Sequence, residues 1–352
     1  MSETPSTPLY RTVRQIGMDL VADLAWPQLW QGVEEPTGGY EQLARAMDRC
    51  LSRLTDLALW GTANREPSLE LWNVAGEPLS RGWLQYRART KPRGYAGDHE
   101  LLGRMYSGQC CDDPLGRLFD RYFLGQAAPL AVRHRMEMMR GWIVEEVARR
   151  AAGAAGGGKP PLKVAMVGSA FGAEIRDALG QLTPDQRAAI EIVLLDIDPA
   201  AAATAEQQLA GLAAEGRLRA VGANIFRLPQ RPNLAELLDD SDLLFCPGLF
   251  DYLDDAAAAA MLRCLYERLA PGGRLVVFQF APHNPTRAYM EWLASWYLIY
   301  RDLAAFQGVV AAAGISAEEA EFGAEPQGVD LFVSIRRGGL PVRGGTRTDT
   351  GR

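Results

Sequence analysis

Residues 159–337 alternate between two hydrophobic periods, and this alternation limits the fold more than any other feature of the sequence. Stretches with helical spacing follow most of the short apolar runs, which lie at 163–167, 190–195, 218–221, 242–246 and 274–280. Parallel strands need crossover connections between them, usually helices. Two last runs, near 315–322 and 329–335, fit an antiparallel hairpin at one edge. The pattern predicts an open, mostly parallel α/β sheet of seven strands with helices on both faces.

The chain before this region has helical spacing throughout most of its length. Apolar residues recur every three or four positions in 42–59 and 130–147, whereas a segment rich in Gly, Pro and aromatic residues near 76–98 is expected to be irregular. An Ala- and Gly-rich stretch at 151–158 is typical of a linker. We therefore predict a mostly helical N-terminal domain, an α/β domain and a flexible tail, which cover 1–158, 159–338 and 339–352.

Composition excludes several classes of partner. The net charge is −6 and the pI is about 5.3, so the chain has no general attraction to the phosphate backbone, and we expect no nucleic acid partner. No apolar stretch reaches the roughly 18 residues of a membrane span. We expect a cytoplasmic protein with a small-molecule substrate, and the sequence leaves a homodimer open. No metal-ligand or disulfide spacing occurs among the five cysteines, which are Cys50, Cys110, Cys111, Cys246 and Cys264.

A glycine-containing turn follows the first predicted strand of the α/β domain. The sequence there reads VAMVGSAFGAEIRDAL, and Gly168 and Gly172 bracket a turn that leads directly into a helix. Such a turn brings the backbone close to a ligand and directs helix N–H groups at it. The GxGxxG spacing of dinucleotide enzymes is absent, and the bulky Phe171 favours a nucleoside without a pyrophosphate. We predict that Gly168, Ser169 and Gly172 contact a cofactor.

The ends of the next two strands add polar groups to this turn. Asp196 ends the second strand, where a carboxylate suits the two ribose hydroxyls of an adenosine. Asp198 precedes Pro199 and is better placed as a helix N-cap. Asn224 follows the third strand and is either a partner for an adenine edge or an ordinary turn residue, and Ile225 would pack on the adenine face.

The fourth strand ends in SDLLFCPGLFDYLDD, so Phe250, Asp251 and Tyr252 are expected at the crevice where such sheets bind ligands. The following LAPGGRLVVF is a helix end, a tight turn and a buried strand. A glycine turn, an acidic strand end and a PGG turn in this order resemble the Rossmann-like class I S-adenosylmethionine methyltransferase fold over about 180 residues. The resemblance implies S-adenosylmethionine as the cofactor.

A more specific resemblance lies on both sides of this site. The stretches KPRGYAGDHELL, APLAVRHRMEMM, CPGLFDYL and APHNPTRAYMEWLASWYLIYRD are similar to a bacterial family of methyltransferases of 3-hydroxypalmitic acid methyl ester biosynthesis. This family has a helical domain ahead of the methyltransferase domain. Its glycine turn usually reads GSGPARE where this chain has GSAFGAE, and it usually has asparagine at the position of His134. Some relatives instead cyclise S-adenosylmethionine to azetidine-2-carboxylic acid, releasing methylthioadenosine.

Candidate side chains for the reaction follow from these positions. Phe171, Tyr252 and Tyr95 are aromatic groups that can hold a sulfonium by cation–π attraction. Glu174, in the first turn of the helix, either binds the cofactor's ammonium or complements the helix dipole. His134 and His283 are candidate bases, with His99 a weaker one. Tyr95 lies in the GYAGD loop, which we expect to act as a lid.

Other residues are assigned to the substrate. Arginine side chains form bidentate pairs with carboxylates, and the predicted substrate residues are Arg133, Asn284, Arg287 and Tyr289, with Arg301 a further arginine of this kind. A second aromatic set is expected to form a packing face on a helix over 287–312, and comprises Trp292, Trp296, Tyr297 and Tyr300.

Three functions remain open on the sequence. The first is methyl transfer to an oxygen of a small molecule, such as a carboxylate, in bacterial specialised metabolism or signalling. The second is cleavage of S-adenosylmethionine by cyclisation. The third is a regulatory protein that binds the cofactor without catalysis. The first two give different products from the cofactor alone, so product analysis separates them.

Overall fold

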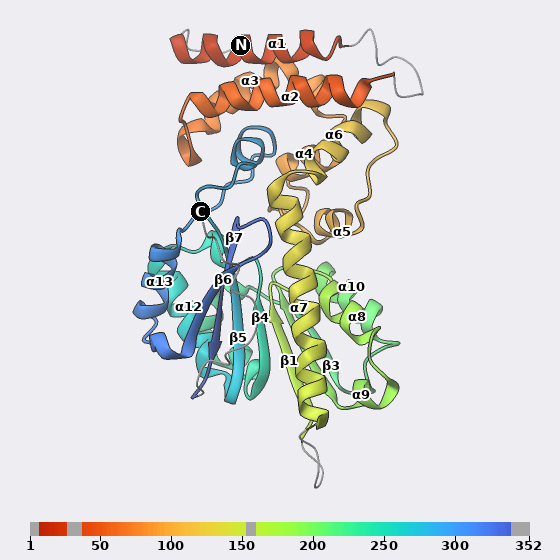
Figure 1. The fold of residues 1–352 in the computed structure, drawn as a ribbon, viewed down its shortest axis with the longest axis vertical. Coiled ribbons are helices and arrows are strands. Elements are labelled where there is room, and N and C mark those ends of the chain that lie inside the picture. Colours follow the sequence, from red (N-terminus) through yellow and green to blue (C-terminus); the bar gives the residue numbers. More distant parts are fainter. Residues whose placement is uncertain (1–6, 27–36, 153–159, 339–352) are drawn as a thin grey trace, which may run out of the picture. The chain divides into compact units, whose positions relative to one another are not determined.

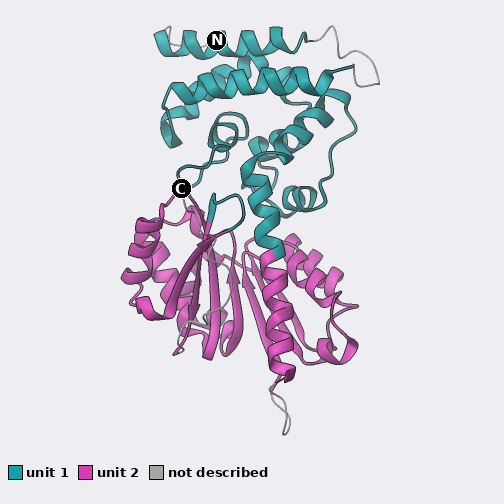
Figure 2. Cartoon of the chain, in the orientation of Figure 1, with its two compact units in different colours: residues 1–137, 282–299, 325–330 teal, residues 138–281, 300–324, 331–352 magenta. Residues whose placement is uncertain are grey.

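The computed structural model describes residues 7–26, 37–152 and 160–338, and its residues group into two compact units. Unit 1 contains residues 1–137, 282–299 and 325–330, and unit 2 contains 138–281, 300–324 and 331–352 (Figure 2). The division therefore falls inside a helix rather than at residue 158, and two later segments belong to unit 1. Most of the expected linker at 151–158 and the expected tail at 339–352 lie outside the described residues.

Unit 1 is helical, as the spacing predicts (Figure 1). Its elements are α1 (Pro8–Asp23), α2 (Gly39–Asp56), η1 (Gly61–Asn64), α3 (Arg65–Leu79), α4 (Trp83–Thr90), α5 (His99–Ser107), α6 (Pro114–Leu124), the first part of α7 (Ala127–Ala152) and the π-helical turn η5 (Tyr289–Leu293). Helix α2 buries Leu43, Met47 and Leu54 on one face. Helices α1 and α3 pack closely, since a Cβ added at Gly17 would lie 3.1 Å from the Val74 Cβ. Burial of these apolar faces is what stabilises the unit.

The segment near 76–98 is more regular than its composition indicates. Pro78 lies in the last turn of α3, and Gly82 is the N-cap of α4, so the break between the two helices is only three residues long. The irregular part is confined to 91–98. It ends at Asp98, whose carboxylate caps α5 by accepting hydrogen bonds from the Glu100 and Leu101 amides and is also paired with Arg87 Nε at 2.8 Å. Tertiary packing thus outweighs the local tendency of Gly and Pro to interrupt a helix.

Unit 2 is built on one seven-stranded sheet in the order β3-β2-β1-β4-β5-β7-β6 (Figure 1). The strands are β1 (Leu162–Val167), β2 (Ile190–Asp196), β3 (Leu218–Gly222), β4 (Ser241–Cys246), β5 (Leu269–Phe280), β6 (Ala320–Ala324) and β7 (Asp330–Arg336). The helical elements are α8 (Ala173–Leu179), α9 (Pro184–Ala188), α10 (Pro199–Leu209), η2 (Ile225–Gln230), α11 (Pro232–Ala235), η3 (Glu236–Leu238), η4 (Phe250–Tyr252), α12 (Asp255–Glu267), α13 (Leu303–Ala312) and η6 (Ala317–Glu319). Strands β1 to β5 pair in parallel, and β6 pairs with β7 antiparallel. The predicted fold class is confirmed.

The two faces of the sheet carry separate cores. In β1, Ala165 and Val167 join the core that packs on α12 and α13, whereas Val164 and Met166 join the core of α8, α10 and the second part of α7. The alternation follows from the two-residue period of a strand. Because both faces are covered, the strand reads as a continuous apolar run rather than as alternating residues.

The prediction of a single helix over 287–312 is wrong. The chain forms η5, then non-helical backbone from 294, and returns to helix only at α13. Ser295 has a φ of +49°, which ends the first turn, and Asp302 caps α13 by accepting a hydrogen bond from the Ala305 amide at 2.8 Å. Between them Arg301 donates its backbone N–H to the Phe280 carbonyl. Contacts distant in sequence therefore fix a segment whose spacing alone indicates a helix.

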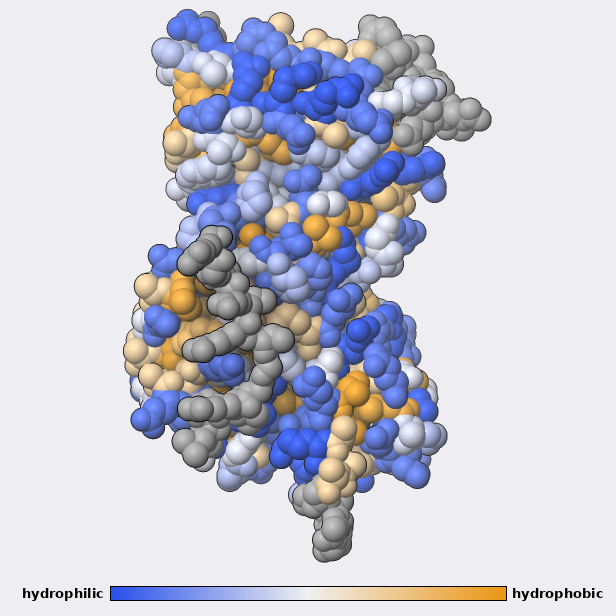
Figure 3. Space-filling model, viewed as in Figure 1, coloured by the Kyte–Doolittle hydropathy of each residue, from blue (hydrophilic) through white to orange (hydrophobic). Residues whose placement is uncertain are grey.

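The length and apolar content of a helix decide whether it can cross a bilayer. No helix among the described residues is long and apolar enough to cross a bilayer. On the face shown in Figure 3, hydrophilic side chains cover most of α1 and α2, with apolar side chains visible among them.

Candidate functional site

The turn after β1 has the backbone geometry that its glycines predict. Gly168 and Gly172 have φ of +75° and +67°, and Ala170 between them has a φ of +45°. The Gly168 amide donates to the Leu195 carbonyl at 2.8 Å, and the Gly172 amide donates to the Ser169 carbonyl at 2.9 Å. The chain therefore reverses within five residues and enters α8. Three left-handed positions within five residues are typical of a ligand-binding loop.

Gly172 is constrained by space as well as by its backbone conformation. A Cβ at this position would lie 3.2 Å from Leu194 Cδ1 and 3.4 Å from Leu209 Cδ1. The turn thus packs directly on β2 and α10.

We expect Gly172→Ala to lower the free energy of unfolding by about 2 to 4 kcal/mol. The left-handed conformation costs an alanine about 1 to 2 kcal/mol, and overpacking adds about 1 kcal/mol or more. Urea unfolding measures the change. Gly180→Ala is the control, since its φ is −61° and its Cβ would meet only ordinary contacts at 3.5 Å. Equal midpoints for Gly172→Ala and the wild type would contradict the steric argument.

Ser169 and Ala170 present polar groups at the centre of the turn. The Ser169 side chain is buried, and its hydroxyl has no hydrogen-bond partner among the residues that the structure describes. The Ala170 amide donates to Asp196 Oδ2 at 2.7 Å. An unsatisfied buried hydroxyl costs about 1 to 3 kcal/mol, so this position has hydrogen-bonding capacity for a ligand.

Asp196 lies at the end of β2 beside the same turn. Its Oδ1 accepts a hydrogen bond from the Asp198 amide at 2.9 Å, while Oδ2 accepts the Ala170 amide. Burial raises the pKa of Asp196 to about 6, although the backbone hydrogen bonds lower it. Each carboxylate oxygen has two lone pairs, so both retain one for a hydroxyl donor. Asp198 instead caps α10 by accepting the Ala200 amide at 2.9 Å, as predicted.

The third strand brings two further predicted residues to this edge. Ile225 is buried next to the turn, since its Cδ1 lies 3.9 Å from a Cβ added at Gly168. Asn224 is exposed and makes no capping hydrogen bond at the start of η2. Both therefore lie in the same loop cluster as the glycine turn and Asp196, because β1, β2 and β3 are adjacent and parallel.

The three predicted residues in the loop after β4 differ in burial and in their contacts. Phe250 is fully buried in the core of α12 and α13, so its ring is not available to a ligand, and this prediction is corrected. Tyr252 is 37% exposed. Asp251 is buried and accepts hydrogen bonds from Gln279 Nε2 and the Phe280 amide, both at 2.8 Å.

Arg301 holds this loop in place. Its guanidinium donates to the Phe250 carbonyl at 3.1 Å, to the Leu253 carbonyl and to Gln279 Oε1 at 2.6 Å. It also pairs with Asp255 at 2.8 Å. The sequence indicates a carboxylate-binding arginine here, but these contacts use its donors within the protein. Arg301 is a positioning residue, and its partner Gln279 carries no sequence signal that identifies it.

Two more predicted residues follow the glycine turn. Phe171 is 7% exposed and Glu174 is 3% exposed, and Glu174 stands in the first turn of α8. The position of Glu174 suits the positive end of the helix dipole. Both residues lie within unit 2, whereas the predicted bases and substrate residues lie in unit 1.

Unit 1 pairs His134 with a carboxylate that sequence reasoning missed. His134 Nδ1 lies 3.0 Å from Glu325 Oε2. Glu325 is buried and also accepts the backbone amides of Gln327 and Val329 at 2.7 and 3.0 Å. The next residue of α7, Arg135, pairs with Asp330 at 3.0 Å. A carboxylate at Nδ1 fixes the tautomer and leaves Nε2 as the acceptor. Residues 191 positions apart form this pair, so spacing offered no signal.

His283 has a different environment. It is exposed, and its Nε2 lies 2.8 Å from the Gly328 carbonyl, which makes that nitrogen the donor. Asn284 is buried, and its Oδ1 accepts the Thr286 amide at 3.0 Å, so its side chain shapes the loop. Tyr95 is partly buried in the GYAGD loop. Gly97 of that loop is in close contact with Trp296, where an added Cβ would lie 2.8 Å from the ring.

Three predicted substrate residues have structural contacts instead. Arg133 donates to the carbonyls of Met105 and Leu124 at 3.2 and 2.7 Å. Arg287 pairs with buried Glu291 at 2.8 Å. Tyr289 is 1% exposed, stacks on a neighbouring aromatic ring and donates its hydroxyl to Gln85. Satisfied donors and buried rings of this kind belong to packing, so these residues are corrected from substrate to structural roles.

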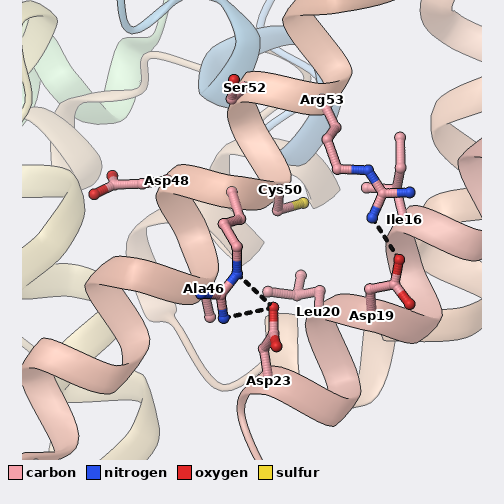
Figure 4. Close-up of a pocket in the computed structure, with 10 residues that line it drawn as sticks. Ile16, Asp19, Leu20, Asp23, Ala46, Asp48, Cys50, Ser52 and Arg53 are labelled. Carbon is pink, nitrogen blue, oxygen red and sulfur yellow. Dashed lines mark hydrogen bonds and ion pairs between the residues drawn. The ribbon is translucent and has the colours of Figure 1, made fainter.

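Two surface pockets are lined by other residues. One of about 410 Å³ lies between α1 and α2, and Figure 4 shows its side chains. Arg49 pairs with Asp23 at 2.8 Å, and Arg53 pairs with Asp19, so its rim charges are already satisfied (Figure 4). Another, of about 590 Å³, is lined by parts of η2, α11 and α12. The described residues also contain no group of three or more His, Cys, Asp or Glu suited to a metal.

Comparison with known proteins supports the fold. No family model and no curated protein matches the sequence. A solved protein of Bordetella parapertussis, described as a "possible exported protein", aligns over 96% of this chain and 99% of its own, with 17% identity and a TM-score of 0.54. The CurJ carbon methyltransferase aligns over 94% and 91% with 15% identity and a TM-score of 0.47. Magnesium protoporphyrin IX methyltransferase of Synechocystis PCC 6803, with bound SAM, aligns over 59% and 83% with 15% identity and a TM-score of 0.39. Only the first score exceeds 0.5, and at 17% identity that likeness is one of fold.

Proposed function

We propose that this protein is an S-adenosylmethionine-dependent methyltransferase that acts on an oxygen of a small molecule. The observation that carries the proposal is the arrangement of the Gly168–Gly172 turn beside the buried carboxylate of Asp196. The bulky Phe171 in the turn and the absence of GxGxxG spacing favour a nucleoside without a pyrophosphate, and the carboxylate at the end of β2 suits two ribose hydroxyls. An adenosine with two ribose hydroxyls and no phosphate fits both groups.

Different residues of unit 2 would bind different parts of the cofactor. Asp196 would accept hydrogen bonds from the ribose hydroxyls with the lone pair that each oxygen retains. The buried Ser169 hydroxyl would form a hydrogen bond with the bound molecule. Ile225 would pack on the adenine and Asn224 would bind its polar edge. When bound, S-adenosylmethionine supplies an activated methyl group on a sulfonium.

Unit 1 contains the candidate group for proton transfer, His134. The Glu325 carboxylate orients His134 through Nδ1, which leaves Nε2 to take the proton of an acceptor hydroxyl or to hold the position of an acceptor carboxylate. Buried Glu325 also stabilises the imidazolium that forms. Glu325 is itself held by backbone amides, so the pair does not depend on a mobile side chain.

Cofactor affinity is expected to fall at acidic pH. The pKa of Asp196 is raised to about 6, so its carboxylate is ionised at pH 7 and becomes protonated below pH 6. A protonated carboxyl loses acceptor capacity for the ribose, so binding at pH 5 should be about tenfold weaker than at pH 7. Calorimetric titration with S-adenosylhomocysteine measures this. An equal Kd at the two pH values would contradict the ribose role of Asp196.

The reaction is tested by product analysis. The purified protein is incubated with S-adenosylmethionine alone and then with a set of small carboxylic acids and alcohols. S-adenosylhomocysteine formed only with an acceptor supports methyl transfer. Methylthioadenosine formed without an acceptor would instead establish the cyclase, and tight binding without turnover would establish a regulatory protein. Binding of a nicotinamide dinucleotide in place of S-adenosylmethionine would overturn the proposal.

A further inference from the structure

Three basic side chains of unit 1 form no ion pair with a carboxylate of the residues that the structure describes. They are Arg65, at the start of α3, Arg89, in the last turn of α4, and Lys91, directly after α4, and we call them the basic cluster. Arg89 Nη2 lies 3.5 Å from the Ser68 carbonyl, in the first turn of the helix that begins at Arg65. Burial, together with the charges of Arg65 and Arg89, lowers the pKa of Lys91. Like charges gathered in this way repel one another.

Arg89 is the most enclosed member of the cluster. Its guanidinium lies 4.5 Å from the centre of the Trp72 ring. Its hydrogen bonds to the carbonyls of Trp292, Leu293 and Ser68 are long, at 3.3, 3.4 and 3.5 Å. Burial lowers its pKa to about 10, so the group stays charged at neutral pH. Weak carbonyl contacts leave most of its hydrogen-bonding capacity unused.

Lys91 and Arg65 complete the cluster. Lys91 has a φ of +49°, a left-handed conformation that normally favours glycine or asparagine after a helix. Its ammonium makes no hydrogen bond or ion pair within the described ranges 7–26, 37–152 and 160–338. Arg65 lies over the Tyr297 ring, 4.8 Å from its centre. Trp72 adds a buried indole N–H that finds no acceptor among the described residues.

The neighbouring cations show what a structural arginine looks like in this unit. Arg87 pairs with buried Asp98 at 2.8 Å, and Arg287 pairs with buried Glu291 at 2.8 Å. Arg93 pairs with Glu100 at 2.8 Å. No such ion pair joins a carboxylate of the described residues to the basic cluster. The cluster therefore has an excess of donors and of positive charge that the protein itself does not balance.

We propose that the basic cluster binds the dianionic phosphate group of a small-molecule ligand. Three positive charges and several free donors match a group with two negative charges and at least three acceptor oxygens. A single carboxylate would leave two of the charges unbalanced. The stacking of both arginines on aromatic rings holds their planar donors in fixed orientations. The proposal uses residues of unit 1 only and does not rest on the proposed methyl transfer.

The proposal is tested on the full chain by calorimetry and thermal melting. Inorganic phosphate, glycerol 3-phosphate and acetate are compared at equal ionic strength, with sodium chloride as the reference. We expect both phosphates to bind and to raise the melting temperature, and acetate to bind at least tenfold more weakly. Tighter binding of glycerol 3-phosphate than of inorganic phosphate identifies a phosphate monoester as the ligand class, and the reverse identifies free phosphate. Either order supports a phosphate site, whereas equal binding of acetate overturns the assignment to a dianion.

Lys91→Gly separates binding from structure. Glycine relieves both the left-handed backbone and the charge repulsion, so the free variant should melt at or above the wild-type temperature while its phosphate affinity falls at least tenfold. Arg65→Gln should behave in the same way. Arg45→Gln, an exposed arginine of α2, is the matched control and should bind phosphate like the wild type. Unchanged phosphate affinity in Lys91→Gly, or a lower melting temperature without ligand, would show a structural lysine and overturn the proposal.

Discussion

Asp196→Asn is expected to weaken S-adenosylmethionine binding by about 100-fold or more. Hydrogen bonds to a charged group contribute about 1.5 to 3 kcal/mol each, so losing the charge on two ribose hydrogen bonds costs about 3 kcal/mol or more. The Asp196 carboxylate accepts hydrogen bonds from the backbone amides of Ala170 and Asp198. An asparagine side chain would turn its NH₂ donor toward one of these two N–H groups, so that hydrogen bond would also be lost. Calorimetric titration with S-adenosylmethionine measures the loss.

The control for this experiment is Asp254→Asn. Asp254 caps α12 by accepting the Ala257 amide at 2.8 Å, and asparagine caps helices as well as aspartate does. Its cofactor affinity should equal that of the wild type. The melting temperature of Asp196→Asn is recorded in parallel, so that unfolding is not mistaken for lost affinity. Wild-type affinity in a folded Asp196→Asn protein would remove the basis of the proposed function.

His134→Asn is expected to lower kcat by about 100-fold or more while S-adenosylmethionine affinity is unchanged. A positioned general base contributes about 10² to 10⁴ in rate, and asparagine cannot accept a proton at neutral pH. Steady-state kinetics measure kcat, and calorimetric titration measures the affinity for S-adenosylmethionine.

Two further variants distinguish a base from a structural histidine. Glu325→Gln removes the charge that orients His134 and stabilises the imidazolium, so it should also lower kcat. Glu137→Gln, an exposed residue of the same helix, is the control and should be fully active. Full activity of His134→Asn, with an unchanged pH profile, would assign His134 to packing with the 325–330 loop.

The strands of unit 2 could be predicted from the sequence because each covered strand is an uninterrupted apolar run. The glycine turn and Asp196 were also visible, since local backbone chemistry and the end of a strand place them. Gly172 requires its left-handed backbone and its close packing on Leu194. Asp198 before Pro199 is a helix start that sequence alone identifies.

Other residues were misplaced because their partners are distant in the chain. Phe250 follows a strand end but turns into the core, and Tyr289 lies in an aromatic set but is buried against Phe123. Arg301 follows a helical pattern, yet its backbone and guanidinium bind the loop after β4. Glu325 gives no signal at all until the fold brings it to His134.

By itself the sequence determined the parallel sheet, the turn after its first strand and the acid at the end of its second. These features are local, because a two-residue apolar period, a left-handed glycine and a strand terminus depend only on neighbouring residues. Only the tertiary structure decided which histidine has a carboxylate partner, which arginines are neutralised and which stay unpaired. Those properties depend on burial and on pairings between distant residues, and they set the charge of each group because an ionised side chain must find its partner when water is excluded.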